Sequence, residues 1–93
     1  MNFTHEQYAM SFHQAREHGI DYRNFEKIDC LPEGVRLTAI AGIWGDYQNM
    51  RCLFMGECGQ CYLRNIRGGG GEYVIRELGQ NAKEIAVGQV FVV

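Results

Sequence analysis

Two turn signals divide residues 35–66 into three runs with alternating character, and this pattern predicts three antiparallel β-strands. Trp44-Gly45-Asp46 sets the first turn and Gly56-Glu57-Cys58-Gly59 sets the second. Because successive side chains of a strand point to opposite faces, counting back from the turns assigns each residue to one face. One face is a predicted core, made of Leu37, Ala39, Ala41, Ile43, Met50, Cys52, Phe54, Cys61 and Leu63.

The other face of the predicted sheet mixes aromatic, aliphatic and cationic side chains. Its members are Arg36, Ile40, Trp44, Tyr47, Asn49, Arg51, Leu53, Met55, Gln60, Tyr62, Arg64 and Ile66. Such mixtures are typical of interface patches. Arg51 and Arg64 are predicted cross-strand neighbours, and like charges placed opposite destabilise a sheet unless an anion relieves them. In an alternative arrangement, the C-terminal segment or the connector covers this face and the arginines reach out at its edge.

A helix is predicted from about His5 to His18. Thr4 and Gln7 have the spacing of a capping box, and Phe3 and Tyr8 have that of a hydrophobic staple. Gly19 stands where a left-handed residue is expected after the last turn. The apolar stripe of this helix is expected to pack on the core face of the sheet, and it comprises Tyr8, Phe12 and Ala15.

The remaining segments are a connector and a C-terminal third. Residues 20–34 carry scattered apolar side chains and end in a Pro-Glu-Gly turn, so we expect a connector packed on the domain. Apolar positions in 72–87 fit a helical stripe, although Gly79-Gln80-Asn81 could equally join two strands. We favour a helix over part of this span. Residues 90–93 form a final strand, apolar on both sides and therefore central.

These elements predict an α+β fold for a single domain, residues 1–93. The N-terminal helix packs on an antiparallel β-meander of about four or five strands, with a second helix within 72–87. A small β-barrel with one attached helix is the alternative. Hydrophobic residues at 46% and charged residues at 22% suit a folded soluble domain. No signal peptide or membrane-spanning run is visible, so a cytoplasmic location with reduced cysteines and no membrane partner is expected.

Neither a metal site nor a catalytic site is predicted. The Cys58-x-x-Cys61 pair forms one knuckle, whereas structural zinc sites usually combine two. The candidate ligands of an alternative zinc-binding module are Cys30, Cys52, Cys58 and Cys61. The chain has no Gly-x-Ser-x-Gly elbow, and the glycines at 68–71 lack the Gly-Lys-Ser/Thr ending of a phosphate loop. The sequence therefore predicts no enzyme and no cofactor.

The arginine-aromatic face leads to a functional expectation. We expect a small non-enzymatic binding protein, a regulator or inhibitor, that binds a protein partner with an acidic surface. Its size and single domain are typical of small phage- or plasmid-borne proteins that act on a host machine. The predicted partner-binding residues are Arg36, Trp44, Tyr47, Arg51, Leu53, Tyr62 and Arg64.

A β-rich nucleic-acid-binding protein is the alternative from another class. In it, the aromatic residues of the same face would stack on bases and its arginines would contact phosphates. The net charge of -2 argues against this reading, because nucleic-acid binders usually carry a basic excess.

Overall fold

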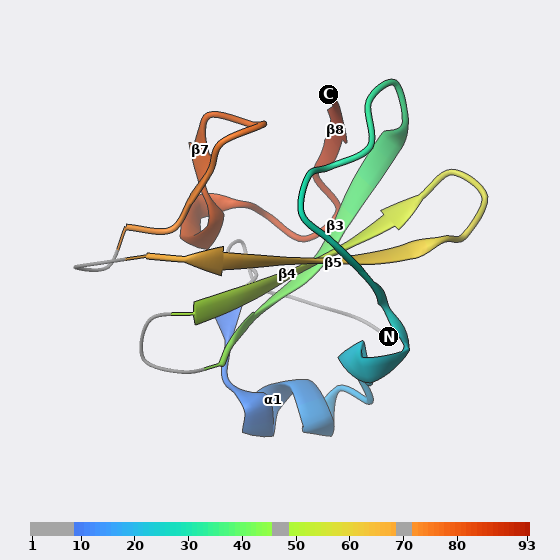
Figure 1. Ribbon diagram of the computed structural model, residues 1–93. Helices are drawn as coiled ribbons and strands as arrows, with labels where there is room; N and C mark the ends of the chain where they lie inside the picture. The colour runs from blue at the N-terminus through green and yellow to red at the C-terminus, as the bar shows by residue number, and fades with distance from the viewer. Residues whose placement is uncertain (1–8, 46–48, 69–71) are drawn as a thin grey trace.

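The structure is a computed structural model, and it describes residues 9–45, 49–68 and 72–93 (Figure 1). This part of the chain has a mixed α+β fold that consists mostly of sheet, with one short helix, α1 (Phe12–Glu17). The predicted α+β class is therefore confirmed. The described strands form an open sheet and no closed barrel, so the alternative barrel is not what forms. No helix in the described ranges is long and apolar enough to cross a membrane.

The main sheet is built around the predicted antiparallel meander. Its strands are β3 (Arg36–Trp44), β4 (Asn49–Gly56) and β5 (Cys61–Arg67). Two short strands that the sequence did not predict, β1 (Ala9–Met10) and β2 (Glu26–Ile28), add to the edges in parallel orientation, giving the order β1-β3-β4-β5-β2. The last strand, β8 (Val90–Val92), pairs antiparallel with the first half of β3.

A β-bulge in β3 reverses the faces of the second half of that strand. Ala39 lies opposite Phe54 and Ala41 lies opposite Leu53, so two residues of β3 advance against one residue of β4. Side chains after the bulge therefore point to the face opposite the one expected. The prediction of a single core face is correct for Leu37 and Ala39 and wrong for the half of β3 nearest the turn.

The second hairpin shifts the faces again, because its loop has three residues. Phe54 lies opposite Tyr62, and the turn is closed by the Gly59 amide, which donates to the Gly56 carbonyl at 3.2 Å. Gly59 has a φ of 85°, the left-handed conformation that this loop type requires at its third position. Side chains of β5 consequently lie one position away from the predicted register: Tyr62 shares a face with Phe54, and Leu63 does not.

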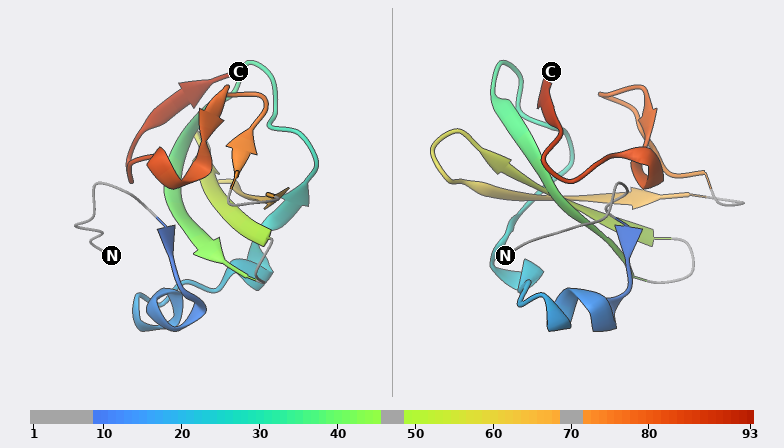
Figure 2. Two further views of the ribbon diagram at one scale, coloured as in Figure 1. Left: turned by 90° about the vertical axis from the view of Figure 1, so that its left-hand side faces the viewer. Right: turned by 180° about the vertical axis from the view of Figure 1, so that it is seen from behind.

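The sheet consequently has a core on each face. Cluster 1 lies beneath the C-terminal segment; it contains Leu31, Leu37, Ala39, Met50, Cys52, Phe54, Ile66, Tyr73, Ile75, Ala82 and Ile85. Cluster 2 lies beneath α1 and the connector; it contains Met10, Ala15, Ala41, Ile43, Leu53 and Leu63. Figure 2 shows α1 on one side of the sheet and the C-terminal segment on the other. Each side of the sheet is therefore packed against other elements, and the residues of the predicted arginine-aromatic face are divided between the two sides.

The α-helix begins later than predicted. Its N-cap is Ser11, whose hydroxyl accepts from the Gln14 amide at 3.2 Å while the Gln14 side chain accepts from the Ser11 amide at 2.9 Å. The residues before it, β1, are extended and pair with β3, which buries Met10. The predicted end is confirmed, with His18 as C-cap and Gly19 at a φ of 72°. The predicted cap and staple at residues 3–8 lie outside the described residues.

The segment 72–87 contains no α-helix, so the favoured prediction was wrong there. It forms a small hairpin of β6 (Val74–Ile75) and β7 (Gln80–Asn81), followed by a 3-10 turn, η2 (Ala82–Glu84). The prediction of β8 as a central strand was also wrong. β8 has β3 as its only described neighbour, and only one face of it, through Phe91, packs against cluster 1.

The connector is packed on the domain, as predicted. It forms a 3-10 turn, η1 (Tyr22–Asn24), before β2. Ile20, Tyr22 and Phe25 are half-buried against cluster 2. The parallel pairing of β2 with β5 fixes where this connector lies, because Glu26 pairs with Tyr62 and Ile28 with Arg64.

Candidate partner-binding groove

The structure does not bring the seven predicted binding residues onto one surface. Arg36 is exposed at the start of β3, whereas Leu53 is fully buried in cluster 2. Arg51 faces the α1 side of the sheet, and Arg64 faces the C-terminal segment. The predicted Arg51–Arg64 proximity was wrong, because the register places Arg51 opposite Asn65. Tyr47 lies outside the described residues.

The C-terminal segment covers one part of the predicted patch, which matches the alternative arrangement expected from the sequence. Trp44 makes an edge-to-face contact with Tyr73, with ring centres 4.7 Å apart. The ammonium of Lys83 lies 4.2 Å from the centre of the Trp44 ring. Arg64 is half-buried and forms an ion pair with Glu77, and Tyr62 packs at the edge of cluster 1. These side chains hold the fold together across the sheet.

Arg51 is the predicted binding residue whose surroundings resemble a recognition site. Its Cζ lies 5.4 Å from the centre of the Phe12 ring and 5.3 Å from that of Tyr22. Guanidinium groups placed over aromatic faces gain cation–π attraction, which strengthens as water is excluded. Arg51 thus joins β4 to the two elements that cover cluster 2.

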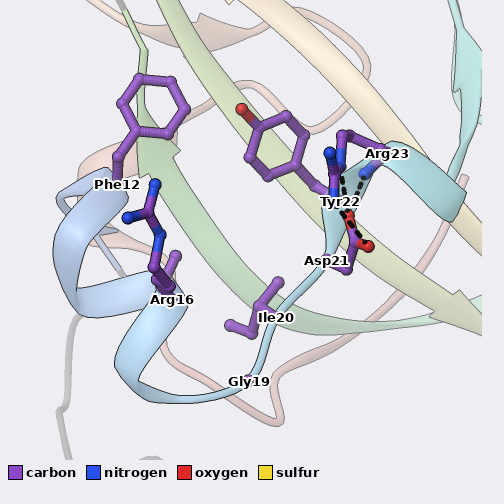
Figure 3. Close-up of a pocket in the computed structure, with 8 residues that line it drawn as sticks. Phe12, Arg16, Gly19, Ile20, Asp21, Tyr22 and Arg23 are labelled. Atoms are coloured by element: carbon purple, nitrogen blue, oxygen red, sulfur yellow. Dashed lines mark hydrogen bonds and ion pairs between the residues drawn. The ribbon is translucent and has the colours of Figure 1, made fainter.

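Phe12 and Tyr22 belong to a groove between α1 and η1 with a volume of about 450 Å³ (Figure 3). The helix forms one wall and η1 forms the other, and Ile20 lies between them. The groove is lined by Phe12, Ala15, Arg16, Gly19, Ile20, Asp21, Tyr22 and Arg23. It therefore combines two aromatic rings with two guanidinium groups.

Local backbone interactions set the geometry of this groove. The Ile20 amide donates to the Ala15 carbonyl at 3.0 Å, which closes the turn after the helix. Asp21 then caps η1 by accepting from the Arg23 amide at 3.2 Å. Short polar side chains favour such positions because they replace backbone hydrogen bonds at a helix start. The result is a chain reversal that places Tyr22 beside Phe12, with ring centres 5.8 Å apart.

The two arginines of the groove differ in their surroundings. Arg23 is engaged by Asp21, with Nε–Oδ1 at 2.9 Å and Nη2–Oδ2 at 3.2 Å. The Arg23 side chain, followed by its backbone amide, lowers the pKa of the Asp21 carboxyl by hydrogen bonding to its ionised form. Arg16 is exposed and makes no ion pair within the described part of the chain. Its guanidinium points up the groove toward Phe12 (Figure 3).

A second, smaller hollow has Arg51 in its lining. It measures about 260 Å³ and is lined by Lys27, Ile28, Asp29, Arg51, Leu63 and Asn65. The Nη1 atom of Arg51 is buried without a hydrogen-bond partner among the described residues. A buried N–H that lacks a partner costs free energy, and this atom gives Arg51 no hydrogen bond that would fix its position. Packing against the Phe12 and Tyr22 rings holds the Arg51 guanidinium in place instead.

The cysteines do not converge. Cys52 is buried on the cluster 1 face, whereas Cys61 is one of the residues of β5 that alternate onto the opposite face. Cys30 and Cys58 are exposed, and none of the four cysteines forms a disulfide. Across residues 9–45, 49–68 and 72–93, no group of three or more His, Cys, Asp or Glu side chains is placed to hold a metal ion.

Comparisons of this chain with protein-family models, with curated protein sequences and with solved structures find no match.

None of the eight residues that line the groove was among the predicted binding residues. The four of them that carry an aromatic ring or a guanidinium are Phe12, Arg16, Tyr22 and Arg23. A local signal was present, since an aromatic residue flanked by Asp21 and Arg23 follows the helix-ending Gly19. The sequence gives no indication that this segment faces Arg51, because that depends on how β2 pairs with the distant β5.

Proposed function

We propose that the protein is a non-enzymatic binding protein that recognises an acidic segment of a partner protein in the groove between α1 and η1. One observation carries the proposal. An exposed arginine, Arg16, stands beside two aromatic rings that hold a second arginine, Arg51. Arginine and tyrosine are enriched among the residues that dominate binding energy, because they combine a large contact area with directed hydrogen bonds.

The charges of the groove favour a partner that carries carboxylates. Asp21 already neutralises Arg23, whereas Arg16 has no ion pair with a described residue. A guanidinium binds a carboxylate through two parallel hydrogen bonds, which gives both attraction and orientation. Phe12 is 38% exposed and offers an apolar surface next to that charge. The matching ligand is a segment in which Asp or Glu stands beside a Leu or Phe.

A regulatory or inhibitory role in the cytoplasm is part of the same proposal. A single small domain acts on a larger machine by occupying one of its surfaces. The groove supports this role because a shallow site with two rings and an available guanidinium suits a protruding side chain of another protein. Small phage- or plasmid-borne proteins that inhibit host proteins act in this way.

The proposal is tested with short synthetic peptides in which Asp or Glu flank a Leu or Phe. Matched peptides carry Asn or Gln instead of the acids. Binding is followed by NMR chemical-shift changes at Phe12, Ile20 and Tyr22, and the dissociation constant is taken from the titration. Arg16→Glu is the test variant, and Arg76→Glu, an exposed arginine in the turn between β6 and β7, is its control.

We expect the acidic peptides to shift the groove resonances and the amide peptides to leave them unchanged. Arg16→Glu should weaken binding by about tenfold or more, because it replaces an attraction with a repulsion. Arg76→Glu should bind like the unmodified protein. Equal binding of acidic and amide peptides, or an equal loss in both variants, would contradict the proposal. A groove that binds a single-stranded oligonucleotide and none of the peptides would favour the nucleic-acid alternative.

A further inference from the structure

β8 leaves one edge of the main sheet without a described neighbour (Figure 2). The Ala39 amide donates to the Gln89 carbonyl at 2.9 Å, and the Gly34 amide donates to the Val93 carbonyl at 3.0 Å. The backbone N–H and C=O groups of the odd-numbered residues in and beside β8 therefore point toward β3. Because backbone groups alternate along an antiparallel strand, the N–H and C=O groups of Val90 and Val92 point away from β3.

This edge lacks the features that usually keep edge strands apart. Monomeric proteins protect their edges with charged residues, proline or bulges. The strand reads Val90-Phe91-Val92, with no charge and no proline. Val90 is 47% exposed and Val92 is 63% exposed. Both the backbone and the apolar side chains of this strand are therefore open to a neighbour.

We propose that this edge binds a second copy of the chain, forming an antiparallel β8–β8 pair about a two-fold axis at Phe91. In this register Val90 of one copy lies opposite Val92 of the other. Such residue pairs exchange both of their backbone hydrogen bonds, so all four outward groups of each strand are satisfied. Register and symmetry agree because the three-residue strand is centred on Phe91, as an isologous interface requires.

The side chains of this pairing are also compatible with a second copy. Phe91 packs edge-to-face on Phe54 at 6.3 Å, and the two Phe91 rings of a dimer would extend cluster 1 across the axis. On the opposite face, Thr38 stands beside Val90 and Arg36 stands beside Val92. Across the dimer, Arg36 and Val92 of one copy would then align with Val90 and Thr38 of the other. Such a row of side chains holds one arginine, so no two arginines lie directly opposite each other.

The dimer is expected to be weak, and it does not compete with the groove. A pair of three-residue strands buries far less surface than a standard stable interface of about 1,600 Å². Association should therefore depend strongly on protein concentration. β8 lies at the end of the fold opposite α1, so the groove stays open in each copy (Figure 1).

The test is sedimentation of the full chain over a range of concentrations. We expect the average mass to rise from that of one chain toward that of two chains. Val92→Lys adds a charge at the edge, and Val90→Pro removes an outward N–H that β3 does not use. Each variant should raise the dissociation constant by about tenfold or more. Val74→Lys is the matched control, since Val74 is an exposed strand valine (52%) outside this edge, and it should associate normally.

Amide hydrogen exchange locates the contact. Val90 and Val92 amides should exchange quickly in dilute protein and more slowly in concentrated protein, whereas the Phe91 amide should be protected at both concentrations. Unchanged thermal melting of Val92→Lys or Val90→Pro shows that the variant is folded. A chain that stays monomeric throughout, or a dimer that leaves the Val90 and Val92 amides unprotected, would overturn the proposal.

Discussion

The guanidinium of Arg64 and the carboxylate of Glu77 form an ion pair, with Nη2–Oε1 at 3.2 Å, that ties β5 to the turn between β6 and β7. The Nε atom of Arg64 donates to the same carboxylate oxygen at 3.2 Å. The two side chains are 19% and 15% exposed, so water screens this pair less than it screens a surface pair. The pair helps to hold the C-terminal segment over cluster 1.

Glu77→Ala should therefore destabilise the fold. It leaves the half-buried guanidinium of Arg64 without its carboxylate, a loss that is expected to cost about 1–3 kcal/mol of unfolding free energy. Urea unfolding measures the difference. Glu84→Ala removes an exposed carboxylate from the same segment and should cost much less. If both variants unfold at the same urea concentration, the ion pair contributes no more than surface charge does.

Phe54→Ala tests the core under β8. The side chain is fully buried in cluster 1, so its removal should cost about 3–5 kcal/mol through lost burial and the cavity left behind. A loss of this size can unfold a small domain. Met55→Ala is the control, because Met55 is the next residue of β4 and is 41% exposed. A thermal melt of Phe54→Ala that matches that of Met55→Ala would show that cluster 1 is not packed as described.

The antiparallel meander could be predicted because its turns and its alternation are local properties of the sequence. The face that each side chain occupies could not be predicted, since one additional residue in a strand or in a loop moves the following side chains to the other face. The bulge between Ala39 and Ala41 and the three-residue loop ending at Gly59 each shift the side-chain parity by one. Both faces of β4 are rich enough in apolar residues to be buried, so the sequence pattern did not reveal either shift.

Gly59→Ala tests the loop that sets the second register. Gly59 has a positive φ, and a Cβ there would meet no atom within 4 Å, so the expected cost is that of the backbone alone. For an L-residue in the left-handed region this cost is about 1–2 kcal/mol. Gly59→Asn should lose less unfolding free energy than Gly59→Ala, because asparagine adopts the left-handed region more readily than alanine does. Equal stability of the alanine variant and the parent protein, measured by urea unfolding, would contradict the loop geometry.

The groove depends on contacts between segments distant in sequence, and this is why it was not predicted. Phe12 and Tyr22 were assigned to a helix stripe and to a connector. They meet Arg51 only because β2 joins β5 in parallel and α1 covers cluster 2. Arg51 itself was predicted as a binding residue from its place on the mixed face of the sheet.

The ion pair at the groove should be visible in an acid titration. The Arg23 side chain lowers the pKa of the Asp21 carboxyl below its ordinary value of 3.8. Folding thus favours the ionised carboxylate, and its contribution to stability is present above that ordinary value and is lost as the pH falls through the lowered pKa. NMR titration of the Asp21 carboxyl should show a midpoint below 3.8. In Arg23→Gln the midpoint should rise, whereas in Arg76→Gln it should not.

Salt separates the two classes of ligand proposed for the groove. A single-stranded nucleic acid held by Arg16, Arg23 and Arg51 would release counterions, and its affinity would fall log-linearly with salt with a slope of about 2 for three phosphate contacts. A protein segment held by one carboxylate and by apolar contacts with Phe12 and Ile20 has no such counterion atmosphere to release. We therefore expect the affinity for an acidic peptide, measured between low and physiological salt, to fall with a log-log slope well below the slope of about 2 expected for the nucleic acid. A slope near 2 that falls by about 0.7 in Arg16→Gln would identify phosphate as the bound group and replace the protein partner with a nucleic acid.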